Sequence, residues 1–131
     1  MKLLIDTQIA LWAISDDPKL SKRARALIED EDTEIVVSVV SIWEVAIKHP
    51  LQRGSVNDVL IPGRRARELF EQSGFSILPV TAAHAEAVDD LPPLHGDPFD
   101  RMLIAQALTE PMHLVTHDRR LATYGALVTV V

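Results

Sequence analysis

Four carboxylates in this sequence have the residue type and the chain positions that a shared metal site would need: Asp6, Glu44, Asp100 and Asp118. Carboxylates that crowd together repel one another, and one or more stays protonated unless a cation holds them. Mg²⁺ or Mn²⁺ suits such a set, because the chain has no cysteine and none of its histidines falls at ligand spacing. Such an ion acidifies a bound water and stabilises charge on phosphoryl oxygens. The four acids therefore indicate metal-assisted hydrolysis of a phosphodiester.

The elements that must position these acids alternate between strands and helices. Apolar runs predict strands at residues 3–5, 35–37, 75–80, 113–116 and 127–130. Helical patterns lie at residues 7–14, 21–30, from 41 onward, 64–73, from 81 onward and from 97 onward, with a short helical turn before the last strand. Strands that are apolar on both faces and alternate with amphipathic helices indicate a mainly parallel sheet covered on both sides. We therefore expect an α/β fold, a three-layer α/β/α sandwich around four to five strands.

Capping residues mark several of the predicted helix ends. Ser21 and Thr81 suit helix N-caps, Asp97 does so with proline behind it, and Gly74 suits a left-handed helix end. Residues 49–63 are rich in proline, glycine and asparagine and predict a loop.

In a parallel sheet, ligands bind beyond the carboxyl ends of the strands. Asp6 and Asp118 each follow a predicted strand and so share that edge. Glu44 lies on a helix that departs from the edge, and Asp100 lies in the first turn of a helix that leads into the strand before Asp118. The four acids are therefore expected to converge.

Helix capping and ion pairing offer a second interpretation of each acid. In this interpretation Asp6 is an N-cap and nothing more, and Ser41 with Glu44 matches a capping box. Asp97 fits an N-cap with Asp100 near the positive helix end. The last of the four acids precedes two arginines and fits a cap or a surface ion pair. None of these alternatives requires all four acids to share one sheet edge.

Composition sets the class of protein. At 131 residues, with 47% hydrophobic and 24% charged residues, the chain matches one soluble globular domain, residues 1–131. The absence of cysteine excludes disulfides and thiol nucleophiles and fits a reducing compartment. The first apolar run is too short for a signal peptide, and no apolar stretch approaches the roughly 18 residues of a membrane span. We expect a soluble, cytoplasmic protein that does not contact a membrane.

The net charge of −6 argues against a nucleic-acid partner, because phosphate binding usually leaves a basic surface. Acids concentrated in a pocket that cations neutralise would reduce the force of this argument. Basic residues also cluster at 22–25, 64–67 and 119–120, although the simpler interpretation is a solvated helix face.

The remaining polar and aromatic candidates are given structural interpretations. His95 and His117 lie near the predicted edge, where we interpret them as polar surface residues. The large aromatic side chains at helix positions are interpreted as core and not as base-stacking platforms: Trp12, Trp43, Phe70 and Phe99.

Four segments together resemble PIN-domain nucleases, and more narrowly the VapC-type toxins of bacterial toxin–antitoxin pairs. They are residues 4–7, 41–45, 95–107 and 114–118, in the order and spacing of that family. Single motifs such as Asp6-Thr7 are weak, whereas the block 95–107 combined with the other three is specific. The resemblance covers nearly the whole chain, except that residues 50–63 align with nothing in the family.

The resemblance implies a PIN-like fold and a Mg²⁺- or Mn²⁺-dependent endoribonuclease. It also implies a cognate antitoxin, a homodimer and a toxin–antitoxin hetero-oligomer. The acidic positions of the family fall on the same four carboxylates, with Asp6 and Asp100 as the main metal ligands. The hydroxyl after the first acid falls on Thr7, which would orient Asp6 or a bound water. Asp97 and Arg101 match an extended motif of the subgroup without an assigned role.

Three other phosphate-binding classes lack a required feature here. A dehalogenase-type phosphatase needs a second aspartate at the position of Gln8. A receiver domain needs a phosphoacceptor where the chain has residues 79–81, and a Rossmann domain needs glycines in the turn at residues 6–9. A PIN-like module that only docks a partner predicts a degraded acid set, whereas all four positions are acidic.

Overall fold

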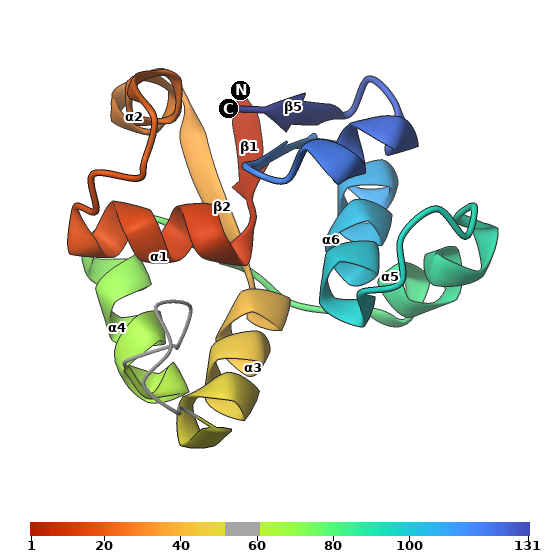
Figure 1. Cartoon of the computed structure of the whole chain (residues 1–131), viewed down its shortest axis with the longest axis horizontal. Helices are drawn as coiled ribbons and strands as arrows, with labels where there is room; N and C mark the ends of the chain where they lie inside the picture. The colour runs from red at the N-terminus through yellow and green to blue at the C-terminus, as the bar shows by residue number, and fades with distance from the viewer. Residues whose placement is uncertain (52–60) are drawn as a thin grey trace.

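A parallel sheet forms the centre of the computed structural model, which describes residues 1–51 and 61–131 (Figure 1). Its five strands are β1 (Lys2–Ile5), β2 (Glu34–Ser38), β3 (Ser76–Leu78), β4 (His113–Thr116) and β5 (Val128–Val130). They lie in the order β3-β2-β1-β4-β5, and every neighbouring pair is parallel. The predicted sheet of four to five strands is confirmed, and it is parallel throughout.

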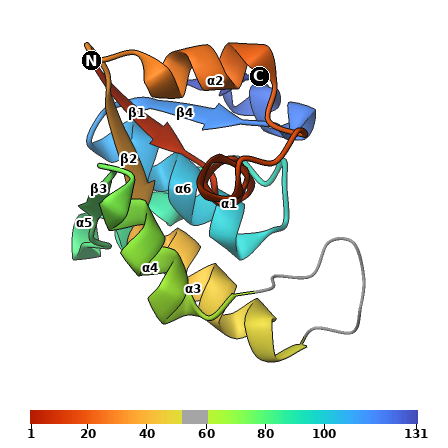
Figure 2. The same cartoon turned by 90° about the vertical axis from the view of Figure 1, so that its left-hand side faces the viewer.

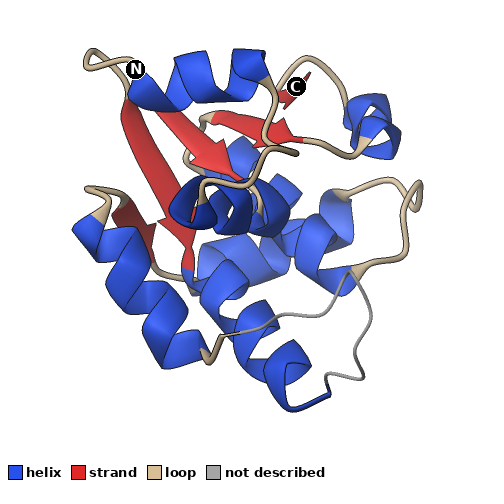
Figure 3. Cartoon of the chain, turned by 60° about the vertical axis from the view of Figure 1, so that its left-hand side comes forward, coloured by secondary structure: helices blue, strands red, loops and turns tan. Residues whose placement is uncertain are grey.

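Helices cover both faces of this sheet (Figures 1 and 3). The α-helices are α1 (Thr7–Ser15), α2 (Lys22–Glu29), α3 (Val39–Lys48), α4 (Gly63–Gln72), α5 (Ala82–Ala87) and α6 (Pro98–Thr109). Short 3₁₀ segments are η1 (His49–Leu51), η2 (Val88–Asp90) and η3 (Arg119–Tyr124). Figure 2, turned by a right angle, shows α1 nearly end-on and α2 and α4 on the same side of the sheet. The three-layer α/β/α architecture is confirmed.

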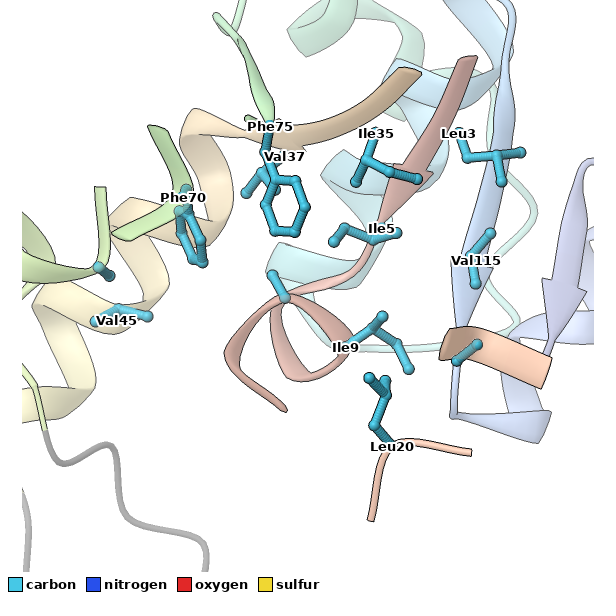
Figure 4. Packing of buried hydrophobic residues seen from close by; sticks show 13 residues of the cluster. Leu3, Ile5, Ile9, Leu20, Ile35, Val37, Val45, Phe70, Phe75 and Val115 are labelled. Atoms are coloured by element: carbon cyan, nitrogen blue, oxygen red, sulfur yellow. The ribbon is translucent and has the colours of Figure 1, made fainter. Parts of the chain in front are cut away.

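Two hydrophobic cores explain why the strands are apolar on both faces. Successive strand residues point to opposite sides of a sheet. Leu3 and Ile5 of β1 therefore enter the core beneath α1, α2 and α4, where Phe70 is fully buried (Figure 4). Leu4 between them enters the second core, against α6. A polar residue at any of these strand positions would face one core or the other.

One helix begins earlier than the sequence predicts. Ser38 caps α3, its hydroxyl accepting a hydrogen bond from the Val40 N–H at 2.9 Å, so the helix starts at Val39 and not near Ser41. The interpretation of Ser41 and Glu44 as a capping box is therefore wrong. Ser41 instead lies buried inside α3 and accepts a hydrogen bond from the Thr7 hydroxyl.

The other predicted helix ends agree with the structure. Ser21, Thr81 and Asp97 each cap a helix through a side-chain oxygen, and Gly74 follows α4 with a φ of +82°. The predicted loop at residues 49–63 begins as η1, and its residues 52–60 lie outside the described part of the chain.

Of the four aromatic residues predicted to be core, three contribute to it. Phe70 is buried, and Trp12 and Phe99 pack partly buried against the two cores. Trp43 does not: it is 54% exposed and touches Phe99 edge-on, with ring centroids 5.1 Å apart. Within residues 1–51 and 61–131, no helix combines the length and the apolar character that crossing a membrane requires.

Candidate active site

All four predicted acids line one pocket of about 430 Å³ at the carboxyl edge of the sheet. Asp6 follows β1, Glu44 lies on α3, Asp100 lies in the first turn of α6, and Asp118 follows β4. The pocket also includes a further carboxylate, Asp97, and residues that place positive charge or polar groups around the acids: Thr7, Gln8, Lys48, His117 and Arg119. Segments more than 100 residues apart in the chain therefore meet where the parallel topology predicts.

Asp6 is the most buried of the four acids, with 6% of its surface exposed. Its Oδ1 accepts the Ile9 N–H at 2.8 Å, which caps α1, and its Oδ2 accepts the Thr116 hydroxyl. Burial raises the pKa of Asp6 to about 6, against the lowering effect of these two hydrogen bonds. The negative charges of Asp100 and Glu44 raise it further. The N-cap interpretation of Asp6 is thus correct, but the cap uses only one carboxylate oxygen.

Asp100 shares its end of α6 with a histidine and a second aspartate. His95 Nε2 lies 2.9 Å from Asp100 Oδ2, while Asp97 Oδ1 accepts the N–H groups of Phe99 and Asp100. Burial and the charge of Asp97 raise the pKa of Asp100, and His95 opposes them. Potential ligand atoms of His95, Asp97 and Asp100 lie within 4.8 Å of one another. The prediction that no histidine falls at ligand spacing is therefore wrong in three dimensions.

Glu44 and Asp118 differ from the other two acids because each is paired with a cation. Lys48 Nζ contacts Glu44 Oε2 one helical turn away on α3. Arg120 Nη2 lies 2.7 Å from Asp118 Oδ2, and these hydrogen bonds lower the pKa of Asp118. Asp118 also caps η3 through the Arg120 N–H. The cap and the ion pair proposed for Asp118 are both present, on a residue that also lines the pocket.

The hydroxyl that holds Asp6 is not the one expected from the sequence. Thr7 was expected to orient Asp6 or a bound water, but its hydroxyl donates to Ser41 Oγ at 2.8 Å. The hydroxyl that donates a hydrogen bond to Asp6 Oδ2 is that of Thr116. The available signal was a single hydroxyl residue ending the apolar strand of β4, two positions before Asp118.

Arg101, the other residue of the extended motif, contacts the loop before α6. Its guanidinium donates to the carbonyls of Val88, Pro92 and His95 and to the Tyr124 hydroxyl. These bonds hold the segment between η2 and α6, which carries His95. Arg101 therefore contacts the loop that carries His95 and does not line the pocket.

The basic runs largely form solvated helix faces, as the simpler interpretation predicts. The arginines of residues 64–67 are exposed on α4, where Arg65 and Arg67 pair with Glu68 and Glu71. Arg119 is the exception, because it lines the acidic pocket. His117 lines it too, with its ring edge-on to Trp12 at 5.0 Å.

This donor set fits a hard divalent cation. Carboxylate oxygens from four segments surround the pocket, and a nearby histidine is the sole nitrogen candidate in the cluster at the start of α6. Burial is the main cause of the raised pKa values of Asp6 and Asp100, and repulsion from neighbouring carboxylates adds to it. A bound cation would relieve that repulsion.

Comparison with known proteins gives a consistent result. The family model described as PIN domain matches residues 3–127. A relative from Mycobacterium tuberculosis, Ribonuclease VapC22, is 33% identical over 123 residues, which cover 93% of this chain and 91% of the relative.

Two solved structures share the fold at low sequence identity. VapBC2 from Rickettsia felis, bound to a DNA fragment from its promoter, has a TM-score of 0.68 and 15% identity over 100% of this chain and 98% of that one. VapBC-5 from Mycobacterium tuberculosis, a toxin–antitoxin system, has a TM-score of 0.61 and 16% identity over 99% and 97% of the two chains.

Proposed function

The chain belongs to the PIN-domain family, and from that premise we propose that it is a metal-dependent endoribonuclease, the VapC-type toxin of a toxin–antitoxin pair. We take residues 1–131 as a single nuclease domain that acts in the cytoplasm. The curated relative is named a ribonuclease, which gives the substrate class. The structural neighbour VapBC-5, which is named a member of the VapBC family of toxin–antitoxin systems, suggests the class of partner.

The observation that carries the proposal is the convergence of Asp6, Glu44, Asp100 and Asp118 on one pocket. A protein that needed only helix caps would have no reason to place four carboxylates within reach of one another, because their repulsion destabilises the fold. Burial is the main cause of the raised pKa of Asp6, about 6, and the negative charges of Asp100 and Glu44 add to it.

In the proposed mechanism, Asp6 and Asp100 are the main ligands of Mg²⁺ or Mn²⁺. Glu44 and Asp118 complete the shell or orient the attacking water, and Thr7 lines the same pocket. When bound, the cation would supply water activation and stabilisation of charge on the phosphoryl oxygens. Lys48 and Arg119 lie on the pocket wall, where their positive charges attract the RNA backbone. Hydrolysis then follows in-line attack on an RNA phosphodiester.

The proposed partners follow from the same family. A cognate antitoxin would neutralise the toxin in a hetero-oligomer, and the toxin would itself form a homodimer. A basic side chain of the antitoxin is the chemical group that matches the acidic pocket, since it would satisfy the same carboxylates as a cation.

Purified Asp6→Asn and Asp100→Asn variants test the catalytic assignment. Each replaces one oxygen ligand by an amide of equal size, so we expect RNA cleavage with Mg²⁺ or Mn²⁺ to fall by at least about 100-fold while the fold is retained. Asp89→Asn, an exposed aspartate in η2, is the matched control and should cleave like the wild type. Full cleavage by either pocket variant would refute the assignment.

Melting experiments separate this enzyme from the two alternatives. Mn²⁺ should raise the melting temperature of the wild type, because a ligand that binds only the folded state stabilises it. A non-catalytic docking module predicts no such response. A different metal-dependent phosphoesterase predicts the response but no cleavage of RNA.

A further inference from the structure

Thr116 connects two of the four acids through a single hydroxyl group. It is the last residue of β4 and is completely buried, with 0% of its surface exposed. Its Oγ1 donates a hydrogen bond to Asp6 Oδ2. The same oxygen accepts the backbone N–H of Asp118 at 3.0 Å. One side chain thus contacts Asp6 directly and fixes the backbone where Asp118 begins η3.

The direction of these hydrogen bonds is determined by the chemistry of the groups. A backbone N–H can only donate, so the Asp118 N–H uses Thr116 Oγ1 as an acceptor. The one hydroxyl proton is then free to point at the Asp6 carboxylate, which as an ion can only accept. Hydrogen bonds arranged in such a chain polarise and strengthen one another.

The hydroxyl is not needed to hold the two strands together. The backbone of Asp6 is already anchored to β4, because its N–H donates to the Val115 carbonyl at 3.0 Å. Residues 3–5 pair in register with 113–115. What the Thr116 hydroxyl adds is the orientation of the carboxylate, since the other oxygen, Oδ1, is occupied by the cap to Ile9.

We propose that Thr116 is a positioning residue for the metal site, which sets the orientation of the Asp6 carboxylate and couples it to the placement of Asp118. This inference rests on the proposed function, because it assigns Thr116 a role in the same pocket. The branched side chain supports that role, since a threonine in a strand has few χ1 rotamers and its buried methyl group locks the hydroxyl in place.

Two pairs of variants test the hydroxyl at constant shape. Thr116→Val keeps the volume of the wild-type side chain and removes only the hydrogen-bonding group. Thr116→Ala and Thr116→Ser differ from each other in the same way, and they replace the first comparison if Thr116→Val does not fold. The control is Thr129→Val. Thr129 lies on the neighbouring strand β5, where it pairs with Val115, and it does not line the pocket.

Mn²⁺ affinity, followed as the concentration dependence of the melting temperature, is the first measurement, and kcat on RNA at saturating Mn²⁺ is the second. Loss of a residue that orients a ligand typically lowers metal affinity or activity by about 10- to 100-fold. We expect that loss in Thr116→Val and Thr116→Ala, recovery to within about tenfold of wild type in Thr116→Ser, and wild-type values in Thr129→Val.

The outcomes separate this inference from the proposed function. If the wild type neither binds Mn²⁺ nor cleaves RNA, the proposed function fails. If the wild type does both, and Thr116→Val is only less stable while its folded fraction keeps wild-type Mn²⁺ affinity and kcat, Thr116 is merely structural and the inference is overturned. Equal losses in Thr116→Ala and Thr116→Ser would also overturn it.

Discussion

The two ends of α6 carry polar residues in different surroundings. At its N-terminal end, Asp97 and Asp100 face a pocket in which acidic groups outnumber basic ones. At its C-terminal end, Gln106 and Glu110 face His84 of α5. We refer to His84, Gln106 and Glu110 as the His84 cluster. One helix therefore has clustered acidic groups at one end and a hydrogen-bonded polar network at the other.

The His84 cluster satisfies most of its hydrogen-bonding groups within the chain. His84 is 1% exposed, and its Nδ1 accepts the Thr81 N–H at 3.0 Å. The hydrogen of the neutral ring must then be on Nε2, which lies 2.6 Å from Glu110 Oε2. Gln106 donates to the Pro79 carbonyl, and only its Oε1 is unpartnered among the buried side-chain atoms of the described residues.

The difference suggests a test of which polar cluster stabilises the fold and which belongs to the proposed metal site. Buried polar groups that find partners fix one element against another, as the His84 cluster fixes α5 on α6. Buried carboxylates that are left to repel one another lower stability, and proteins retain such strain where it is used. Substitutions at the two ends of α6 should therefore have opposite effects on the free energy of unfolding.

The largest expected effect on stability comes from His84→Ala. This change leaves a cavity and removes partners from the Thr81 N–H, Gln106 and Glu110, so it should lower the free energy of unfolding by about 2 to 4 kcal/mol. Urea denaturation measures it, with the exposed His113 on β4 as the matched control in His113→Ala. The Mn²⁺-induced rise in melting temperature should persist. A loss below 1 kcal/mol would mean that the cluster does not hold α5 in place.

The opposite sign is expected for Asp6→Asn in metal-free protein. The folded-state pKa of Asp6, about 6, lies above its ordinary value of 3.8, so the folded protein binds this proton more tightly than the unfolded chain does. The contribution of Asp6 to stability is therefore most favourable below pH 3.8 and is lost as the pH rises towards 6. An asparagine has no such charge. We expect Asp6→Asn to be about 1 to 3 kcal/mol more stable than wild type at pH 7.5, and the gain to disappear near about pH 4.

Urea denaturation at the two pH values measures this difference. Asp32→Asn, at an exposed aspartate outside the pocket, should show no comparable gain. If Asp6→Asn were less stable than wild type at neutral pH in the absence of metal, the buried charge of Asp6 would not destabilise the fold. The contrast between the two ends of α6 would then be lost.

Metal binding should follow the same titration. As the pH falls below the Asp6 pKa of about 6, Asp6 takes up a proton in the folded protein, and a protonated carboxyl is a poor ligand. We expect Mn²⁺ affinity to fall by up to about tenfold per pH unit below that value and to level off above it. Mn²⁺ titrations followed by melting at pH 5 and pH 7.5 measure the change. A flat profile would exclude Asp6 as a ligand.

Local signals in the sequence predict the elements and the edge where the acids meet. Asp97 followed by proline marks the start of α6, and apolar runs without alternation mark the strands of a parallel sheet. The start of α3 is harder to predict, because Val39 and Val40 continue the apolar run of β2. The structure is needed to show that β2 ends at Ser38 and that Ser38, and not Ser41, caps α3.

Tertiary contacts determine the features that the sequence does not predict. His95 reaches Asp100 because Arg101 holds the connecting loop, and nothing in the spacing of residues 95–100 fixes that path. Thr116 meets Asp6 across 110 residues of chain. Trp43 has the residue type of the core, yet its face of α3 is turned outward. Pattern alone specifies which residues lie at the edge but not which of their atoms are paired.

The smallest expected effect tests a cation that the chain itself places in the pocket. Lys48 contacts Glu44 and lines the pocket, so its ammonium group competes with a metal ion for the same carboxylate. Two unit charges about 4 Å apart interact by about 1 kcal/mol in water, which corresponds to about fivefold in binding.

Lys48→Met, which keeps an unbranched apolar stem, should therefore raise Mn²⁺ affinity about two- to fivefold. It should lower the free energy of unfolding by no more than about 0.5 kcal/mol, since Lys48 is about half exposed and ion pairs one helical turn apart contribute little. The same titration on Lys22→Met, at an exposed lysine of α2, should show no change. Weaker Mn²⁺ binding by Lys48→Met would show that Lys48 supports the metal site, and the pocket would then resemble the self-compensated His84 cluster more closely than its acid content suggests.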